Sequence, residues 1–384
     1  MPAPPNVALL VETSNAYARG LLRGIRRYVR EHGPWSLYLG EQRRGEAAPT
    51  WLARWRGDGI IARIETAAIA RAVLAAKKPA VDVSAARHVP RLPYVETDDD
   101  EIARLVTAHL VERGFRHLAF CGDPRFQWSN LRAKHLERRV AQAGLTCDVY
   151  QPGARARRSG SWEVEKADLG RWLVRLPKPV GIMACYDIRG RQVLDVCREQ
   201  SIAVPDQVAV IGVDNDELMC DLASPSLSSV APDAAATGYE AARLLDEMMA
   251  GRKVAPGGRF IRPIGIVTRG STDVLATDDA ELSQAVRFIR EHASEGIKVD
   301  NVLRAVPLSR RVLEARFRKL LGRSPHEEIE RIRLERARQL LAETELPQTS
   351  IAERCGYRHA EYFSVVFKRA TGETPSEFRA KQQG

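Results

Sequence analysis

The chain has 384 residues, of which 44% are hydrophobic and 28% are charged, and its formal net charge is +10. These values are ordinary for folded proteins and exclude a disordered chain, a collagen-like repeat and a membrane bundle. The longest apolar runs, VALLV and VAVIGV, are far shorter than the ~20 residues that span a bilayer, so no membrane partner is expected. The opening MPAPPNVALLVE lacks the basic stretch of a secretory signal, which predicts a cytoplasmic chain of two or three domains.

The basic surplus is concentrated toward the C-terminal end. Residues 281–384 hold 20 basic and 15 acidic residues, so about a quarter of the chain carries half of the net charge. A local basic surplus favours a polyanionic partner, although a solvated basic face is the commoner meaning of a single charge run. The six cysteines form no CxxC pair, which predicts reduced core thiols and neither a disulfide framework nor a metal site.

From the N-terminus to about residue 265, short apolar runs alternate with amphipathic stretches of helical length. The runs include VALLV, GIIAR, HLAFCG, VGIMACYD and VAVIGVDN, and the stretches include AYARGLLRGIRRYVRE and DDEIARLVTAHLVERG. Continuous apolar strands between helices are typical of parallel sheets that are covered on both faces. About 260 residues of this pattern exceed one comfortable sheet, so we predict two α/β lobes.

Polar residues gather after these predicted strands, where parallel sheets bind their ligands. The candidate ligand-binding residues are Asn15, Tyr17, Arg132, Asp187, Asp214 and Asn215. Carboxylates and guanidinium groups bind neighbouring hydroxyls bidentately and a ring stacks on a sugar face, so these residues predict a polyhydroxylated ligand. Structural roles stay open as well. Asp187 would then cap a helix, Arg132 would lie on a solvated helix face, and the Asp-Asn pair would shape a turn.

Five segments of this part of the chain resemble the effector domain of the LacI/GalR family over residues 6–273: VALLVE, YVETDDDEIARLVTAHLVERGFRHLAFCGDP, GIMACYDIRGRQVLDVCREQSIAVPDQVAVIGVDNDEL, LSSVAP and PIGIVTRGST. The resemblance implies an α/β two-lobed, periplasmic-binding-protein-like (type I) sensor domain, a sugar in the cleft and dimerisation through the lobes. It also implies that Arg132 matches the family's sugar-binding arginine. Asp187 then matches the polar residue after the central strand, and Asp214 or Asn215 the pair after the next strand. Only five residues precede this domain, where the family carries a helix-turn-helix.

The C-terminal part contains a duplication, since residues 299–325 superimpose on residues 349–375 without a gap at an offset of 50. Phe317 falls on Phe367, and Pro325 falls on Pro375. Each copy has a short helical stretch, a tight turn and a longer helical stretch, which predicts two helix-turn-helix motifs in an all-α domain.

The longer helix of each copy has an apolar stripe for the core and an opposite face that is polar and mostly basic. Side chains on such a face reach base edges and phosphates when the helix enters a major groove. A solvated face is the alternative on charge alone, but the turn and the duplication favour DNA. The predicted DNA-binding residues are Ser309, Arg310, Arg311, Glu314, Arg318, Arg358, His359, Glu361, Ser364 and Lys368.

Between the copies, HEEIERIRLERARQLLAET has apolar residues at helical spacing and follows Ser324-Pro325, which is typical of a capped helix start. At 1.5 Å per residue this connector is about 30 Å long, close to the ~34 Å between successive turns of a major groove. One chain is therefore expected to occupy two adjacent grooves on one face of the DNA.

The segment IAERCGYRHAEYFSVVFKRATGETPSEFR resembles the AraC/XylS-type DNA-binding domain, including its glycine turn and its G-x-T-P-x-x-[FY]-R ending. A LacI/GalR-type sensor followed by this module is similar to the activators of xylose operons along the whole length, and ASEGIKVDNVL is one of the segments that carry the similarity. That resemblance implies xylose as the effector. The predicted domains are a sugar-binding domain at 1–275 and a DNA-binding domain at 276–384.

The sequence therefore predicts a sugar-responsive transcription factor that binds double-stranded promoter DNA as a homodimer, with lobe closure controlling DNA binding. An activator of xylose genes would contact RNA polymerase. A repressor, or a regulator that responds to a different sugar or polyol, is the alternative. The chain has no GxSxG, GxxxxGK or HExxH motif, so neither catalysis nor a cofactor is expected. A transport-type sugar-binding protein needs export, which the N-terminus does not offer.

Overall fold

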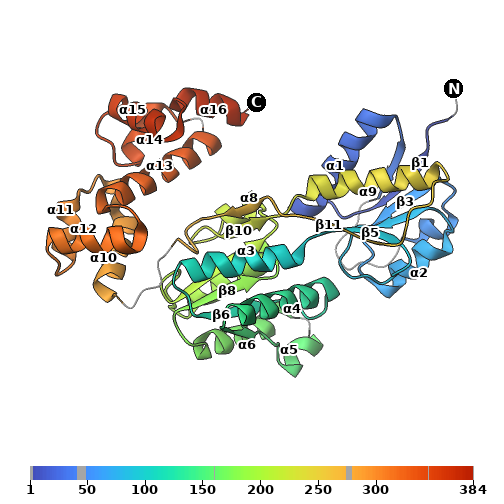
Figure 1. Cartoon of the computed structure of the whole chain (residues 1–384), viewed down its shortest axis with the longest axis horizontal. Coiled ribbons are helices and arrows are strands. Elements are labelled where there is room, and N and C mark those ends of the chain that lie inside the picture. Colours follow the sequence, from blue (N-terminus) through green and yellow to red (C-terminus); the bar gives the residue numbers. More distant parts are fainter. Residues whose placement is uncertain (1–2, 41–48, 160, 274–278, 345, 384) are drawn as a thin grey trace. The chain divides into compact units, whose positions relative to one another are not determined.

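The computed structural model describes residues 3–40, 49–159, 161–273, 279–344 and 346–383, and it divides into two compact units, Met1–Val274 and Leu275–Gly384 (Figure 1). The first unit contains two α/β lobes, and the described part of the second is helical, which confirms the predicted fold class. The predicted domain boundary at residues 275 and 276 lies outside the described residues. Among the described helices, none is long and apolar enough to cross a membrane.

The first lobe is built on a parallel sheet whose strands run in the order β11-β5-β4-β3-β1-β2. Both faces of this sheet are covered, because alternate residues of a strand point to opposite sides. Val7 and Leu9 of β1 pack with the helices α1 and α9, whereas Ala8 and Leu10 pack with α2 and the 3-10 helix η1. The elements are β1 (Asn6–Leu10), α1 (Ala16–His32), β2 (Ser36–Leu39), η1 (Thr50–Arg54), β3 (Gly59–Ala62), α2 (Ala67–Ala75), β4 (Ala80–Asp82), β5 (Pro93–Thr97), α9 (Ala234–Met249) and β11 (Gly257–Ile261).

The second lobe has a sheet in the order β12-β10-β9-β8-β6-β7, parallel except where β12 pairs with β10. Its core joins the strands to α6 and α7, and it includes Ile182, Leu194 and Val210. The elements are α3 (Asp99–Glu112), β6 (His117–Cys121), α4 (Gln127–Gln142), β7 (Thr146–Val149), α5 (Ala154–Ser159), α6 (Trp162–Arg175), β8 (Val180–Ala184), α7 (Asp187–Glu199), β9 (Val208–Val213), α8 (Glu217–Asp221), β10 (Ser228–Ala231) and β12 (Gly265–Val267).

Three segments of the described chain connect the two lobes, from β5 to α3, from β10 to α9 and from β11 to β12. Two of the crossings end in a helix cap: Asp98 accepts a hydrogen bond from the Glu101 amide at 3.0 Å, and Asp233 accepts one from the Ala236 amide at 2.8 Å. Crossings of this kind are typical of a hinge between lobes, and residues that follow strands of both sheets line one cavity.

The second unit contains two helix-turn-helix motifs joined by one long helix, α13. Ile329 of α13 packs in the core of the first motif, whereas Leu334, Leu340 and Leu341 pack in the core of the second. With 19 residues, α13 is about 28 Å long. The elements are α10 (Ala280–His292), η2 (Ala293–Glu295), α11 (Val299–Ala305), α12 (Arg310–Leu321), α13 (Pro325–Glu343), α14 (Gln348–Arg354), α15 (Ala360–Thr371) and α16 (Pro375–Gln383).

A buried arginine in the middle of α13 joins the two motifs. Arg333 donates to the carbonyls of Ala293 at 2.8 Å and Ile297 at 2.7 Å, which precede the first motif. Its guanidinium lies 5.6 Å from the ring centre of Tyr357, in the turn of the second motif, and the Tyr357 hydroxyl donates to Glu330. Because the groups that Arg333 contacts come from both motifs, it holds them in one orientation.

Gly356 provides a test of this junction. Its φ is +79°, and an added Cβ would lie 2.7 Å from the Gly296 nitrogen and 2.8 Å from the Ala293 carbonyl oxygen. We expect Gly356→Ala to destabilise the helical unit by about 2 kcal/mol or more, through backbone strain and this close approach. Hydrogen exchange of the α14 and α15 amides in the full chain measures the loss.

Gly322→Ala is the matched control, because Gly322 has a similar φ of +68° but nothing within 4 Å of an added Cβ. This control should lose only the ~1 kcal/mol of backbone strain. Equal losses in the two variants would show that the contact with Gly296 carries no energy.

Candidate ligand cleft and DNA-reading helices

A cavity of about 470 Å³, counted with its open mouth, lies among the carboxyl ends of the strands in the first unit. Its walls combine charged groups of both signs with aromatic rings, and they come from both lobes. The residues that line it are Tyr17, Arg63, Val83, Ser84, Ala85, Glu96, Thr97, Asp99, Trp128, Arg132, Tyr186 and Asp214.

Arg132 of α4 presents a guanidinium group whose position is set by the protein. Its Nε donates to Asp99 at 2.8 Å, and another of its nitrogens donates to the Cys185 carbonyl. The Arg132 side chain is only 11% exposed, and it lies 5.5 Å from the ring centre of Trp128. The carboxylate of Asp99 raises the pKa of Arg132 against the opposing effect of burial. The group is therefore a fixed cation beside an aromatic wall.

A second buried arginine, Arg63, enters the cavity from the end of β3. It forms ion pairs with Glu12 and, at 2.6 Å, with Glu65. Its guanidinium lies 5.6 Å from the ring centre of Tyr17, whose hydroxyl accepts a hydrogen bond from Thr97 at 3.3 Å. The Nε of Arg63 has no hydrogen-bond partner among the described residues. This donor is buried, so a ligand oxygen that reaches it would gain a hydrogen bond that the protein leaves unmade.

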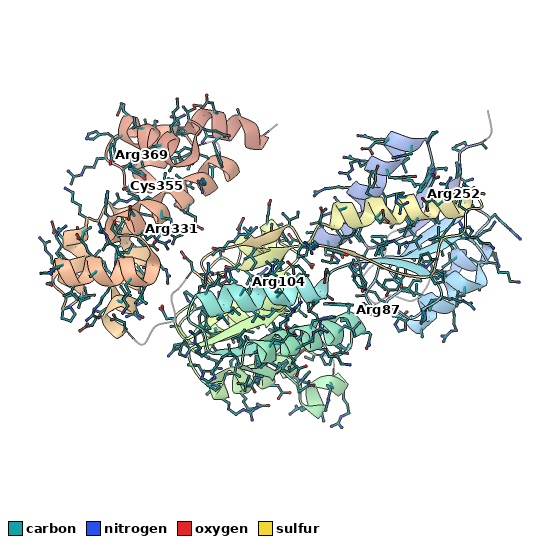
Figure 2. The ribbon with its side chains drawn as sticks, viewed as in Figure 1. Arg87, Arg104, Arg252, Arg331, Cys355 and Arg369 are labelled. Atoms are coloured by element: carbon teal, nitrogen blue, oxygen red, sulfur yellow. The ribbon has the colours of Figure 1, made fainter. Side chains whose placement is uncertain are left out.

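Glu96, at the end of β5, places a carboxylate in the same cavity. One of its oxygens accepts from Arg87, which is labelled in Figure 2, and in the described part of the chain Oε2 has no hydrogen-bond partner. Burial raises the pKa of Glu96 to about 6, against the lowering effect of Arg87. Glu96 is therefore an acceptor that a ligand hydroxyl can complete, provided that the carboxyl group is ionised.

Asp214 lines the cavity from a strained turn after β9, where its φ is +113° and that of Asn215 is +45°. Asp187 holds this turn from behind. It accepts from the Ser229 hydroxyl at 2.6 Å and from the Asp216 amide at 2.7 Å. Burial, followed by the nearby Asp214 carboxylate, raises the pKa of Asp187 well above its ordinary value. The strain is thus maintained by hydrogen bonds that position Asp214.

Three of the six residues predicted to bind ligand line the cavity: Tyr17, Arg132 and Asp214. The structure brings them together although they are distant in the sequence. Arg132 is 9% exposed and paired, so it does not lie on a solvated helix face. Their contact with a ligand stays a prediction.

The other three, Asn15, Asp187 and Asn215, are not among the cavity-lining residues. Asn15 caps α1 by accepting from the Ala18 amide at 2.8 Å. Asn215 accepts from Arg269 at 2.9 Å, and Asp187 holds the turn described above. All three have structural hydrogen bonds, and each of them adjoins or supports the cavity.

Sequence reasoning did not select Arg63, Glu96, Thr97 and Asp99 as ligand-binding residues. The signal was present, since Glu96 and Thr97 end the run YVET and Asp99 follows it, at a strand end like the others. Arg63 follows GIIA in the same way. Aromatic residues complete the wall, with the rings of Trp128 and Tyr186 edge to face at 5.8 Å.

These groups suit a small polyhydroxylated molecule. Fixed guanidinium groups donate to its oxygens, carboxylates accept from its hydroxyls, and rings cover its apolar face.

Among the described residues there is no group of three or more His, Cys, Asp or Glu side chains that could hold a metal ion. The described cysteines are free thiols, and burial raises the pKa of Cys185 to about 11.

In the second unit, α12 and α15 carry the residues predicted to read DNA. Their apolar faces are buried through Leu313, Phe317, Phe363 and Phe367, which leaves the predicted set on the outer face. Eight of the ten are exposed, whereas Glu314 and Ser364 are half-buried. The exposed residues are Ser309, Arg310, Arg311, Arg318, Arg358, His359, Glu361 and Lys368.

Several of these residues also have local partners. Ser309 caps α12, Arg310 donates to Asp300 at 2.5 Å, and the Ser364 hydroxyl donates to the Ala360 carbonyl at 2.9 Å. Arg311 and Lys368 are exposed and do not take part in these local hydrogen bonds. A phosphate or a base edge can therefore reach the guanidinium of Arg311 and the amine of Lys368. DNA contact by the ten residues stays a prediction.

Comparisons with known proteins match every part of this architecture. The chain matches the XylR N-terminal domain over residues 6–100, a periplasmic binding protein-like domain over residues 107–272 and a helix-turn-helix domain over residues 302–381. It is 35% identical over 381 residues to the xylose operon regulatory protein of Escherichia coli K12, which covers 97% of this chain and 96% of that protein. The Haemophilus influenzae protein of the same name is 32% identical over 386 residues, with 97% of each chain covered.

Solved structures agree with these matches. A structure described as the xylose-binding transcription activator XylR is 34% identical, has a TM-score of 0.77 and covers 99% of this chain and 98% of its own. A complex of the regulator CelR with cellobiose is 22% identical with a TM-score of 0.57, and covers 71% of this chain and 86% of its own. At that identity the second comparison supports the fold alone.

Ligand affinity should depend on pH through Glu96. A ligand hydroxyl that donates to Glu96 stabilises the ionised carboxylate, whose pKa is raised by burial to about 6. Affinity should therefore be full above this pH and fall as the pH drops through it, by about tenfold between pH 7.5 and pH 5. Calorimetric titration of a bound sugar across this range measures the effect.

Two variants assign the titrating group. Glu96→Gln should abolish the pH dependence, because no proton is then exchanged at this position. Asp82→Asn is the control: burial raises the pKa of Asp82 to about 7, but it accepts backbone hydrogen bonds from Ile64 and Ser84 and does not line the cavity. If the dependence instead persisted in Glu96→Gln and vanished in Asp82→Asn, Glu96 would not be the acceptor.

Proposed function

Since the chain belongs to the family of the xylose operon regulatory proteins, we propose that it activates pentose-catabolic genes in response to xylose. It is a sugar-responsive, DNA-binding transcription regulator, not an enzyme. The relatives are named for the xylose operon, and the solved structure that resembles this chain over 99% of its length is described as xylose-binding. The sugar-binding part of the proposal is supported chiefly by the cleft, in which Arg132, Arg63 and Glu96 present fixed groups to one cavity.

Xylose fits the chemistry of this cavity. A pentopyranose carries a ring of adjacent hydroxyls and lacks a charged or branched substituent. Arg63 and Arg132 donate to its oxygens, and the carboxylates of Glu96, Asp99 and Asp214 accept from its hydroxyls. Trp128 and Tyr186 provide ring faces. The sugar completes hydrogen bonds at Arg63 Nε and Glu96 Oε2, which favours its binding in the closed cleft.

Closure of the lobes changes the surroundings of the Asp214 turn. Arg19 of α1, in the first lobe, forms an ion pair at 3.5 Å with Asp216, in the second lobe, close to this turn. A ligand held between residues of both lobes favours this closed arrangement, and it shifts the equilibrium only by its differential affinity for the two states.

The turn is also connected to the segment that leads to the DNA-binding unit. Arg269 donates to Asn215 at 2.9 Å and pairs with Asp221 at 3.0 Å. The Arg269 carbonyl accepts from Ser228, whose hydroxyl accepts from Thr272 at 2.7 Å. In the proposed mechanism, closure acts on Asn215 and is transmitted through Arg269 to the end of the first unit.

The remaining parts of the proposal concern partners. The chain acts as a homodimer, which presents two pairs of DNA-reading helices to two half-sites of promoter DNA. Ligand binding brings these half-site contacts into register, and the bound dimer contacts RNA polymerase. The protein works in the cytoplasm, where the chromosomal promoter lies. The basic net charge of +10 supports association with DNA but not its sequence specificity.

Titration with a panel of sugars tests the effector. Xylose should bind more tightly than arabinose, ribose, glucose and xylitol in calorimetry. Arg132→Lys should weaken xylose binding by about ten- to hundredfold, because a lysine cannot reproduce the bidentate fork. Arg189→Lys is the control, since Arg189 is also buried, at 3% exposure, and paired with Glu165 but does not line the cavity. Tighter binding of another sugar would replace xylose as the effector.

Transcription from the promoter tests the sign of regulation. The purified chain should bind the promoter of its xylose genes more tightly with xylose, and it should raise transcription by RNA polymerase in a purified system. Arg311→Ala should weaken DNA binding by about 1 kcal/mol or more without changing xylose affinity. A fall in transcription on addition of the protein would identify a repressor instead.

Arg269→Met tests the transmission step. This variant should keep xylose affinity within about threefold, because Arg269 does not line the cavity. The increase in promoter affinity caused by xylose, typically worth about 1 to 3 kcal/mol, should shrink markedly. Arg198→Met is the control, since Arg198 is exposed and pairs with Asp195 at 2.8 Å. A xylose effect of unchanged size in Arg269→Met would rule out this route.

A further inference from the structure

A second groove lies in the DNA-binding unit, between α13 and the C-terminal half of α15. It encloses about 820 Å³ when counted with its open mouth. Its floor is apolar, because it is lined by the exposed Ala370 and by Leu334 and Val366, whose remaining exposures are 8% and 4%. The residues that line it are His326, Glu327, Glu330, Arg331, Leu334, Arg338, Val366, Arg369 and Ala370.

The acidic residues of this groove are occupied within the protein. Glu327 accepts from the Ser324 amide at 2.6 Å in the cap of α13. Glu330 accepts from Arg333 at 3.3 Å and from the Tyr357 hydroxyl at 3.2 Å. Glu330 is therefore neutralised by Arg333 inside the protein, whereas Glu327 keeps its negative charge at the N-terminus of α13, eleven residues before Arg338.

The cations on the two walls differ in their partners. Arg331 pairs with Glu328 at 2.9 Å and with Glu335 at 3.0 Å (Figure 2). Arg338 and Arg369 are exposed, and no hydrogen bond or ion pair joins either of them to another described residue. Arg338 lies on α13 and Arg369 lies on α15. On each side of the apolar floor there is thus a guanidinium group without an ion-pair partner among the described residues.

Arg369 does not share the helix face that is predicted to read DNA. An α-helix turns by about 100° per residue, so Arg369 lies about 100° from Lys368 but only about 60° from Val366 around the helix axis. Val366 and Ala370 line the groove with it. A phosphate backbone offers nothing apolar to cover Leu334 and Val366, whereas a peptide offers both carboxylates and apolar side chains.

We propose that this groove docks an acidic, amphipathic segment of a partner protein, whose apolar side chains cover Leu334 and Val366 while its carboxylates pair with Arg338 and Arg369. Arginine favours carboxylates here because its planar fork binds them bidentately. Under the proposed function the segment belongs to the transcription machinery, but the chemistry of recognition stands on the groove itself.

Direct binding of a defined peptide tests the groove. The probe is a labelled synthetic helix with leucines at i, i+3 and i+7 and glutamates elsewhere, and its counterpart has lysines in place of the glutamates. In fluorescence anisotropy the full chain should bind the glutamate peptide at least tenfold more tightly than the lysine peptide. Arg338→Glu combined with Arg369→Glu should abolish this preference, and added salt should weaken binding.

The matched control is Arg252→Glu combined with Lys253→Glu, because both positions are exposed in the first unit and the net charge changes equally; Arg252 is labelled in Figure 2. This control should bind the peptide as the unmodified chain does. Equal losses in the two double variants would overturn the proposal, since the effect would then follow net charge alone. The proposal would also be overturned if the groove variant lost as much affinity for promoter DNA as it lost for the peptide. The groove would then be identified as a contact with DNA phosphates.

Transcription measurements separate this inference from the proposed function. At saturating promoter occupancy, the groove variant should lose most of the activation that the unmodified chain produces. An unmodified chain that fails to activate would refute the activator role, while the peptide comparison would still decide whether the groove binds acidic segments.

Discussion

The first unit depends on the neutralisation of two arginines that are buried at one cleft. The burial of an unpaired guanidinium group costs too much free energy. Arg63 is therefore paired with Glu12 and Glu65, and Arg132 is paired with Asp99. Glu12, Glu65 and Asp99 follow β1, β3 and β5, and the pairing of Glu12 with Arg63 depends on the neighbouring parallel strands β1 and β3 ending at the same edge. The same pairing that makes burial tolerable also fixes the direction of each fork, so the cleft is organised before a ligand arrives.

An equivalent constraint organises the DNA-binding unit. Arg333 is 8% exposed, and its donors are taken by the carbonyls of Ala293 and Ile297 and by Glu330. The carbonyls precede the first motif, and the Tyr357 ring that faces the same guanidinium lies in the turn of the second, so the burial of one cation also aligns the two helix-turn-helix motifs. Gly296 and Gly356 permit the close approach that this arrangement requires. The separation of the two reading helices is therefore a property of packing as much as of the length of α13.

The sequence pattern predicted the elements well and the individual contacts less well. Tyr17, Arg132 and Asp214 were found from their positions after strands, and this rule also applies to Glu96 and Thr97 at the end of β5. The rule locates an edge of a sheet, but it does not distinguish a residue that faces the cleft from one behind it. Asn15 and Asp187 follow strands in the same way, and their oxygens are taken by the amides of Ala18 and Asp216.

By itself the sequence determined the two-lobed sensor, the duplicated helical module and the family, because these depend on periodicity, on an offset of 50 residues and on motifs that are local in the chain. Only the tertiary structure decided which polar groups share a cavity, that Arg269 meets Asn215, and that Arg338 and Arg369 flank one apolar groove. The physical reason is that hydrogen bonds and ion pairs depend on distance and direction. The packing of elements that are far apart in the chain sets these distances and directions. They therefore produce no periodic pattern in the sequence.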